Sequence, residues 1–130
     1  MTEQIKASLA STDEENITAT VFNYFNGYAH ADYAQLDGAF SDKAAMFGVI
    51  NDDSNQEAVG VWPDINEVIE RWSKNNNNPD ELTGEILHLN VVNGRIATVL
   101  FKFNNEYYDA LTLAKVNGKW EIIAKVFIYQ

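Results

Sequence analysis

Three tight turns in the last third of the sequence restrict the fold more than any other feature. Asn93-Gly94 and Asn117-Gly118 are two-residue hairpin signals, because Asn and Gly tolerate a positive φ, and Asn104-Asn105 is a plausible third. Strands are predicted between these turns, at about 83–92, 95–103, 106–116 and 119–129. Consecutive antiparallel strands of this kind form a meander with an apolar face that must be covered.

The chain before residue 75 supplies that cover. Apolar residues recur at helical spacing in the segments 12–30, 32–38 and 63–72, and the first segment opens with two overlapping capping boxes. Segments 44–50 and 57–62 are predicted to be the strands of a hairpin. The apolar stripe of the first helix consists of Ile17, Val21, Tyr24, Phe25 and Tyr28. The pattern therefore predicts an α+β fold, with N-terminal helices packed on an antiparallel sheet.

Counting outward from the turns assigns each strand residue to one of two faces. If every turn has two central residues, all cross-strand pairs follow. Asp109 is then the only acid on the face that meets the helices, set between Leu100 and Val126. The other predicted residues of this inner face are Leu87, Leu89, Val91, Ile96, Thr98, Leu111, Leu113, Trp120, Ile122 and Ala124.

The opposite, outer face is half apolar. Helices on one side of the sheet leave it open, so a monomer would expose a patch of Phe101, Tyr108 and Phe127. We expect a homodimer through this patch; the alternative is a monomer, because large aromatic residues are common on strands in any case. His88 and Lys125 are predicted to be neighbours on this face, as polar groups of the interface or its rim, with a functional role as the alternative.

Asp109 is the candidate catalytic residue. A carboxylate among Leu and Val side chains must find a donor, become protonated or face a wet cavity, and such acids serve as general bases or as neutral hydrogen-bond donors. The alternative is a structural role near the strand end, satisfied by a tyrosine hydroxyl or by solvent.

Aromatic residues between the helices and the sheet could line a ligand cavity. The hydroxyl and indole donors of Tyr and Trp suit a planar ligand, although aromatic stripes at helical spacing are also ordinary core. The candidate ligand-binding residues are Tyr24, Tyr28, Phe40, Met46, Trp62, Trp72 and Asp109. A cavity of several hundred cubic ångströms (about 300 Å³ or more) beside Asp109 would favour a ligand site, and a cone filled by tryptophans would favour the core interpretation.

Composition argues against several classes of partner and chemistry. The formal charge of -10 disfavours nucleic acid and anionic membranes. No apolar run is long enough to span a membrane and no signal core is present, so a cytoplasmic location is expected. The chain has no Cys, only two His and none of the glycine-rich nucleotide motifs, so neither a metal nor a cofactor is predicted.

Several segments together resemble the nuclear transport factor 2-like superfamily, and within it the SnoaL-like branch described as putative lumazine-binding. These are Tyr-Phe-Asn-Gly-Tyr-Ala-His-Ala-Asp at 24–32, the turn at 36–40 leading into 44–48, Tyr-Asp-Ala-Leu-Thr-Leu at 108–113, and the closing run 117–127. The resemblance covers roughly residues 13–129. It implies a cone-shaped, cystatin-like fold for a single domain at 13–130, after a flexible segment at 1–12. The chain departs from the family at Ser41-Asp42-Lys43, where members commonly have a His-Pro-Asp-like segment.

This resemblance implies a protein that binds a small planar molecule, hydrophobic or heteroaromatic, and does not fix a reaction. If the protein is an enzyme, the expected chemistry is proton transfer without a cofactor, as in an isomerase, cyclase or dehydratase, with Asp109 as acid or base and Tyr24 or Tyr28 opposite. The alternative is a non-catalytic homodimeric binding or assembly module with a filled cone.

Overall fold

Side-chain caps set the start of each α-helix in the part of the chain that the computed structural model describes, residues 11–75 and 77–130. The hydroxyl of Thr12 accepts a hydrogen bond from the Glu15 N–H at 3.1 Å, and Asp32 and Asp64 cap the next two helices in the same way. The predicted N-terminal segment, except for residues 11 and 12, lies outside the described residues. The helices are α2 (Asp13–Ala29), α3 (Tyr33–Ala39), α4 (Ile65–Trp72) and the short 3₁₀ helix η1 (Pro79–Glu81).

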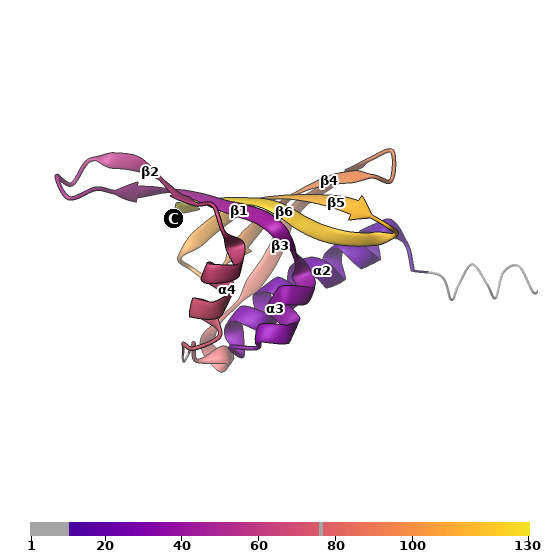
Figure 1. The fold of residues 1–130 in the computed structure, drawn as a ribbon, viewed down its shortest axis with the longest axis horizontal. Helices are drawn as coiled ribbons and strands as arrows, with labels where there is room; N and C mark the ends of the chain where they lie inside the picture. Colours follow the sequence, from indigo (N-terminus) through magenta and orange to yellow (C-terminus); the bar gives the residue numbers. More distant parts are fainter. Residues whose placement is uncertain (1–10, 76) are drawn as a thin grey trace, which may run out of the picture.

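The six strands form one curved sheet in the order β2-β1-β6-β5-β4-β3. All three α-helices lie on one side of it, as Figure 1 shows. Strands β1 and β6 pair in parallel, and all other neighbours are antiparallel. The strands are β1 (Phe40–Asn51), β2 (Glu57–Trp62), β3 (Gly84–Val92), β4 (Ile96–Phe103), β5 (Tyr107–Val116) and β6 (Lys119–Tyr129). The predicted α+β architecture is therefore confirmed, with one parallel pair that the turn pattern does not predict.

Two of the three predicted turns contain one residue more than expected. Val116 does face Lys119 across a two-residue turn, as predicted. However, Val92 faces Ile96, and Phe103 faces Tyr107, so three residues separate the paired ends in both turns. Because side chains alternate between faces, a slip of one residue moves every side chain of β4 to the other face.

This slip corrects the predicted faces of β4. Val99 and Phe101 lie on the inner face and are buried, whereas Leu100 is 47% exposed on the outer face. Asp109 is on the inner face as predicted, but its cross-strand neighbours are Phe101 and Phe127 rather than Leu100 and Val126.

A bulge in β6 produces a second correction. Leu113 faces Ile122 and Thr112 faces Ala124, so Ile123 is an extra residue in β6. Beyond the bulge, Lys125 and Phe127 point inward and Val126 points outward.

The predicted dimer patch is therefore wrong in two of its three residues. Phe101 and Phe127 belong to the core, and only Tyr108 lies on the outer face. The predicted pair of His88 and Lys125 is also wrong: His88 is exposed and faces Leu100, whereas Lys125 is buried and faces Leu111.

The core fills the space between helices and sheet. Rings of α2 and β4 pack edge to face, with centroids 5.7 Å apart for Phe25 and Phe101 and 5.3 Å apart for Phe25 and Phe103. No helix in the described part of the chain has the length and hydropathy needed to cross a membrane.

Candidate functional site

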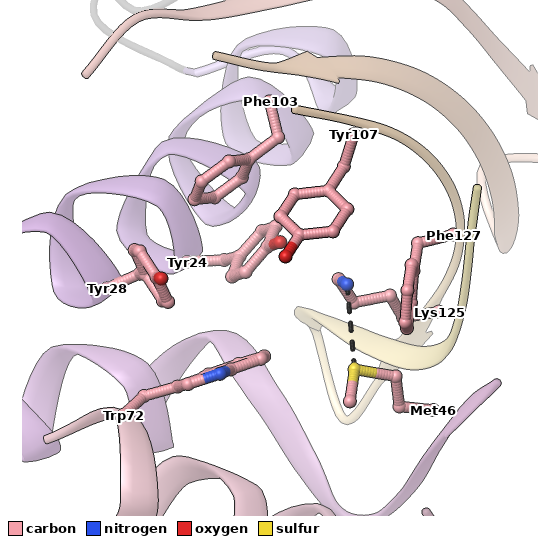
Figure 2. A pocket seen from close by; sticks show the side chains of 8 residues that line it. All are labelled: Tyr24, Tyr28, Met46, Trp72, Phe103, Tyr107, Lys125 and Phe127. Atoms are coloured by element: carbon pink, nitrogen blue, oxygen red, sulfur yellow. Dashed lines mark hydrogen bonds between the residues drawn. The ribbon is translucent and has the colours of Figure 1, made fainter. Parts of the chain in front are cut away.

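A small, partly open cavity lies between the helices and the inner face of the sheet, with a volume of about 100 Å³. Figure 2 shows Lys125 and Tyr107 on the sheet side, and Tyr28 and Trp72 on the helices opposite. The residues that line it are Tyr24 and Tyr28 of α2, Met46 of β1, Trp72 of α4, Phe103 of β4, Tyr107 of β5, and Lys125 and Phe127 of β6. The walls are thus mostly aromatic, with one cationic side chain.

Lys125 is that cation, and only 5% of it is exposed. Its Nζ lies 3.2 Å from Oδ1 of Asp109 and 3.5 Å from the sulfur of Met46. The same Nζ lies 4.6 Å from the ring centroid of Phe127 and 5.8 Å from that of Trp72, within cation–π range. Burial lowers the pKa of Lys125, and the negative charge of Asp109 opposes this effect.

Asp109 lies behind Lys125 and is 1% exposed. Its Oδ2 accepts a hydrogen bond of 2.7 Å from the hydroxyl of Tyr24. Its Oδ1 contacts the ammonium of Lys125 but accepts no hydrogen bond of good geometry within the described chain. Burial, and then the carboxylate of Asp109, raise the pKa of Tyr24 well above its ordinary value. Tyr24, Asp109 and Lys125 therefore form one connected polar group in an apolar interior.

The absence of a side chain at Gly48 allows the ring of Phe127 to line the cavity. A Cβ at Gly48 in the neighbouring strand β1 would overlap that ring. The inward course of β6 after its bulge therefore depends on a residue without a side chain in β1.

The tyrosine hydroxyls at the cavity are held protonated. Burial raises the pKa of Tyr28, with a smaller effect from Glu106. Burial, followed by the charge of Tyr129, raises the pKa of Tyr107 to about 12. Both groups are therefore available as neutral hydrogen-bond donors at neutral pH.

Four of the predicted ligand-binding residues line the cavity: Tyr24, Tyr28, Met46 and Trp72. Three do not. The ring of Phe40 packs behind Tyr24, with centroids 5.4 Å apart, and Trp62 packs against Phe127 at 5.7 Å. Asp109 is separated from the cavity by Lys125.

On the sheet side of the cavity the sequence indicated Met46 alone, and the other lining residues there were not predicted: Phe103, Tyr107, Lys125 and Phe127. The missed signal was Lys125 itself, a charge within the otherwise apolar run at the end of the chain. The core interpretation has tryptophans filling the cone, and of the three tryptophans only Trp72 lines the cavity. The observed volume is nevertheless below the several hundred cubic ångströms (about 300 Å³ or more) typical of ligand sites.

A curved sheet packed on helices, as in the described part of this chain, is the fold of proteins described as NTF2-like and as cystatin-like. Residues 12–128 match the family model described as "Putative lumazine-binding", and the chain belongs to that family. No curated protein matches the chain.

Solved structures with this fold include an NTF2-like protein of unknown function from Shewanella baltica. It is 24% identical, the match covers 93% of this chain and 98% of that one, and the TM-score is 0.75. A protein of the same description from Methylobacillus flagellatus is 24% identical, with coverages of 94% and 96% and a TM-score of 0.74. A ketosteroid isomerase-like protein from Erwinia carotovora is 16% identical, with coverages of 88% and 93% and a TM-score of 0.60. At these identities the likeness shows the fold alone.

Proposed function

We propose that the protein binds a small planar molecule in the aromatic cavity, with a neutral carbonyl oxygen of the ligand on the ammonium of Lys125. The observation that carries this proposal is the buried cation in the cavity wall. An ammonium has three N–H donors. Asp109 Oδ1 makes an ion-pair contact with the ammonium and the sulfur of Met46 is a weak acceptor for one N–H, so donor capacity remains for a ligand.

The charge of the polar group determines which kind of oxygen fits. Lys125 and Asp109 form an ion pair that is neutral in sum. A ligand carboxylate would place a second anion beside Asp109 in an apolar interior, where like charges interact strongly. The formal charge of the whole chain, -10, also disfavours an anion. A carbonyl oxygen can accept a hydrogen bond from an N–H of Lys125, and it brings no additional charge into the cavity.

The walls determine the shape of the ligand. Tyr28, Trp72 and Phe103 present ring faces and edges, which favour stacking and edge contacts with a flat molecule. A volume of about 100 Å³ suits a single ring that reaches the open side of the cavity. The family description supports a flat heteroaromatic carbonyl compound as the class of ligand. Lumazine itself has two fused rings and is larger than the single ring that this volume suits.

Turnover, if this protein is an enzyme, would depend on Lys125. Asp109 does not border the cavity, so a proton exchanged with a ligand would pass through the amine of Lys125. A cofactor-free isomerase, cyclase or dehydratase would therefore use Lys125 as its proton-transferring group, with Asp109 and Tyr24 positioning it. The small volume of the cavity favours binding without turnover over these activities.

Two probes of the same shape test the proposal. Benzamide has a neutral carbonyl group and benzoate a carboxylate, so the two probes differ mainly in charge. An NMR titration that follows the indole resonance of Trp72 measures the affinity of each. We expect saturable binding of benzamide with a dissociation constant of about 1 mM, and binding of benzoate weaker by about tenfold. Equal binding of both, or binding of neither, contradicts the proposal.

The double variant Lys125→Met/Asp109→Asn removes the polar anchor without leaving a buried charge alone. It should lose the binding of benzamide, whereas the control Lys119→Met, an exposed lysine of the same strand, should retain it. Unchanged binding by the double variant would show that the rings alone hold the probe.

A further inference from the structure

We propose that the amine of Lys125 is a nucleophile and that small aldehydes and ketones are captured in the cavity as imines on its Nζ. This inference rests on the proposed function, since it needs the same cavity to admit a carbonyl compound. It adds a covalent step and narrows the class of ligand to reactive carbonyls.

The placement of Lys125 carries the inference. It is the buried lysine of the described chain, and its side chain lines a cavity instead of being enclosed on all sides. An amine whose ammonium form is poorly solvated is a better nucleophile at neutral pH than an exposed lysine. The surrounding rings also exclude much of the water that would hydrolyse an imine.

A proton acceptor is already in contact with the amine. The Nζ of Lys125 must lose a proton before it can attack, and Oδ1 of Asp109 lies 3.2 Å away without a hydrogen bond of its own. The hydroxyl of Tyr24 holds the other oxygen of Asp109 and fixes the orientation of the carboxyl group. The structure therefore supplies both the base and the group that positions it.

The step balances without an oxidant or reductant. The lone pair of the neutral amine forms the N–C bond, and the electron pair of the carbonyl π bond moves to oxygen, which takes up a proton. The nitrogen gives up its first proton, which balances this uptake and leaves a neutral carbinolamine. The nitrogen lone pair then forms the C=N bond as the C–O bond breaks. The hydroxyl takes a second proton and leaves as water, and the nitrogen releases its own second proton. The sum is amine plus aldehyde giving imine plus water.

The charged and titratable groups around the amine come from two elements. Asp109 and Tyr107 face it from β5, and Tyr24 and Tyr28 from α2; β1 and α4 contribute the uncharged Met46 and Trp72. Since the tyrosines stay neutral, Asp109 is the group whose charge acts on the amine. Loss of that charge should favour the neutral amine at lower pH.

Reductive trapping tests the inference. The full chain is incubated near pH 7 with propanal and cyanoborohydride, which reduces an imine to a stable secondary amine, and peptides are mapped by mass spectrometry. We expect Lys125 to be labelled faster than exposed Lys74 and Lys119, because burial lowers the pKa of Lys125 and so increases its share of neutral amine. Labelling of Lys125 at or below the rate of Lys119 overturns the inference.

Two further measurements make the result specific. Benzamide should slow the labelling of Lys125 and leave Lys119 unaffected, and Asp109→Asn should move the pH profile of labelling at Lys125 to lower pH. The control Asp42→Asn, at an exposed site, should not move it. If benzamide binds but propanal does not label Lys125, the inference fails and the proposed function stands. If benzamide also fails to bind, both fail.

Discussion

At the scale of single residues, the buried pair of Lys125 and Asp109 is the unusual feature of this protein. Burying two charges is costly, and their attraction together with the hydrogen bond from Tyr24 offsets only part of that cost. The inward position of Asp109 is predictable from the sequence. The turn at Asn117-Gly118 has the predicted length, and side chains alternate between the two faces along β5 from that turn to Asp109. The partner of Asp109 is not predictable in the same way, because it lies beyond a bulge.

Neutral replacement of this pair should separate its structural cost from its role in binding. Each single variant, Lys125→Met or Asp109→Asn, should lower the free energy of unfolding by about 3 kcal/mol, because it leaves the other group without its partner. The double variant should return to within about 1 kcal/mol of the wild type, since no charge is then buried alone. Denaturation in urea measures all three.

An exposed ion pair provides the control for this comparison. Lys74 lies 3.6 Å from Glu70 on the surface of α4 and the turn after it, and Lys74→Met should change stability by less than about 1 kcal/mol. Additive losses in the double variant Lys125→Met/Asp109→Asn would show that the two buried groups are not coupled.

At the scale of elements, the helices and the strand positions can be predicted from local signals, whereas the faces of β4 and of parts of β3 and β6 cannot. Leu87, predicted on the inner face, is exposed at a bulge in β3, and Ile86 packs on the core instead. The caps at Thr12 and Asp32 are specified by short-range chemistry and are found where the sequence places them. The extra residues at Arg95, Glu106 and Ile123 are not specified by short-range chemistry, because turn length and bulges depend on the curvature of the whole sheet. The extra residue at Arg95 reverses the faces of β4, and the one at Glu106 restores the predicted faces of β5. The bulge at Ile123 reverses the rest of β6, so Phe101 and Lys125 lie on the side opposite to the predicted one.

Two glycine substitutions test how β1 and β6 fit together. Gly48→Ala places a methyl group into the ring of Phe127, so it should destabilise the protein by about 1–3 kcal/mol and weaken the binding of benzamide. Gly38→Ala, in α3 with open space around it, should instead stabilise by about 0.5–1 kcal/mol. Thermal unfolding of both variants measures the two changes in stability, which should have opposite signs. A Gly48→Ala variant as stable as the wild type would mean that Phe127 does not lie over β1.

At the scale of the whole molecule, the outer face of the sheet keeps an apolar patch after the correction of the register, bordered by His88 and Lys102. Leu100 and Val126 are 47% and 44% exposed and both face Ala110, and Tyr108 and Ile128 form the next row. We propose that this outer patch, Leu100, Tyr108, Ala110, Val126 and Ile128, is where two copies of the chain meet. Its support is the continuous apolar surface across three neighbouring strands.

Acidic substitutions test the outer patch. Leu100→Glu should halve the mass measured by sedimentation, because two buried carboxylates would oppose each other across the contact. Val59→Glu, which replaces an apolar residue that is 68% exposed on the edge strand β2, should leave the mass unchanged. A wild-type protein that sediments as a monomer would reject the contact.

The position of Lys125 inside the ring of aromatic side chains is the claim on which both the binding site and the imine depend. The side-chain methylene resonances of Lys125 measure it most directly, because nearby ring faces shift them away from the positions of exposed lysines. We predict that these resonances in the free protein are displaced from those of Lys119 and show nuclear Overhauser contacts to Phe127 and Trp72. Resonances that coincide with those of Lys119, without such contacts, would place Lys125 outside the cavity and contradict the account.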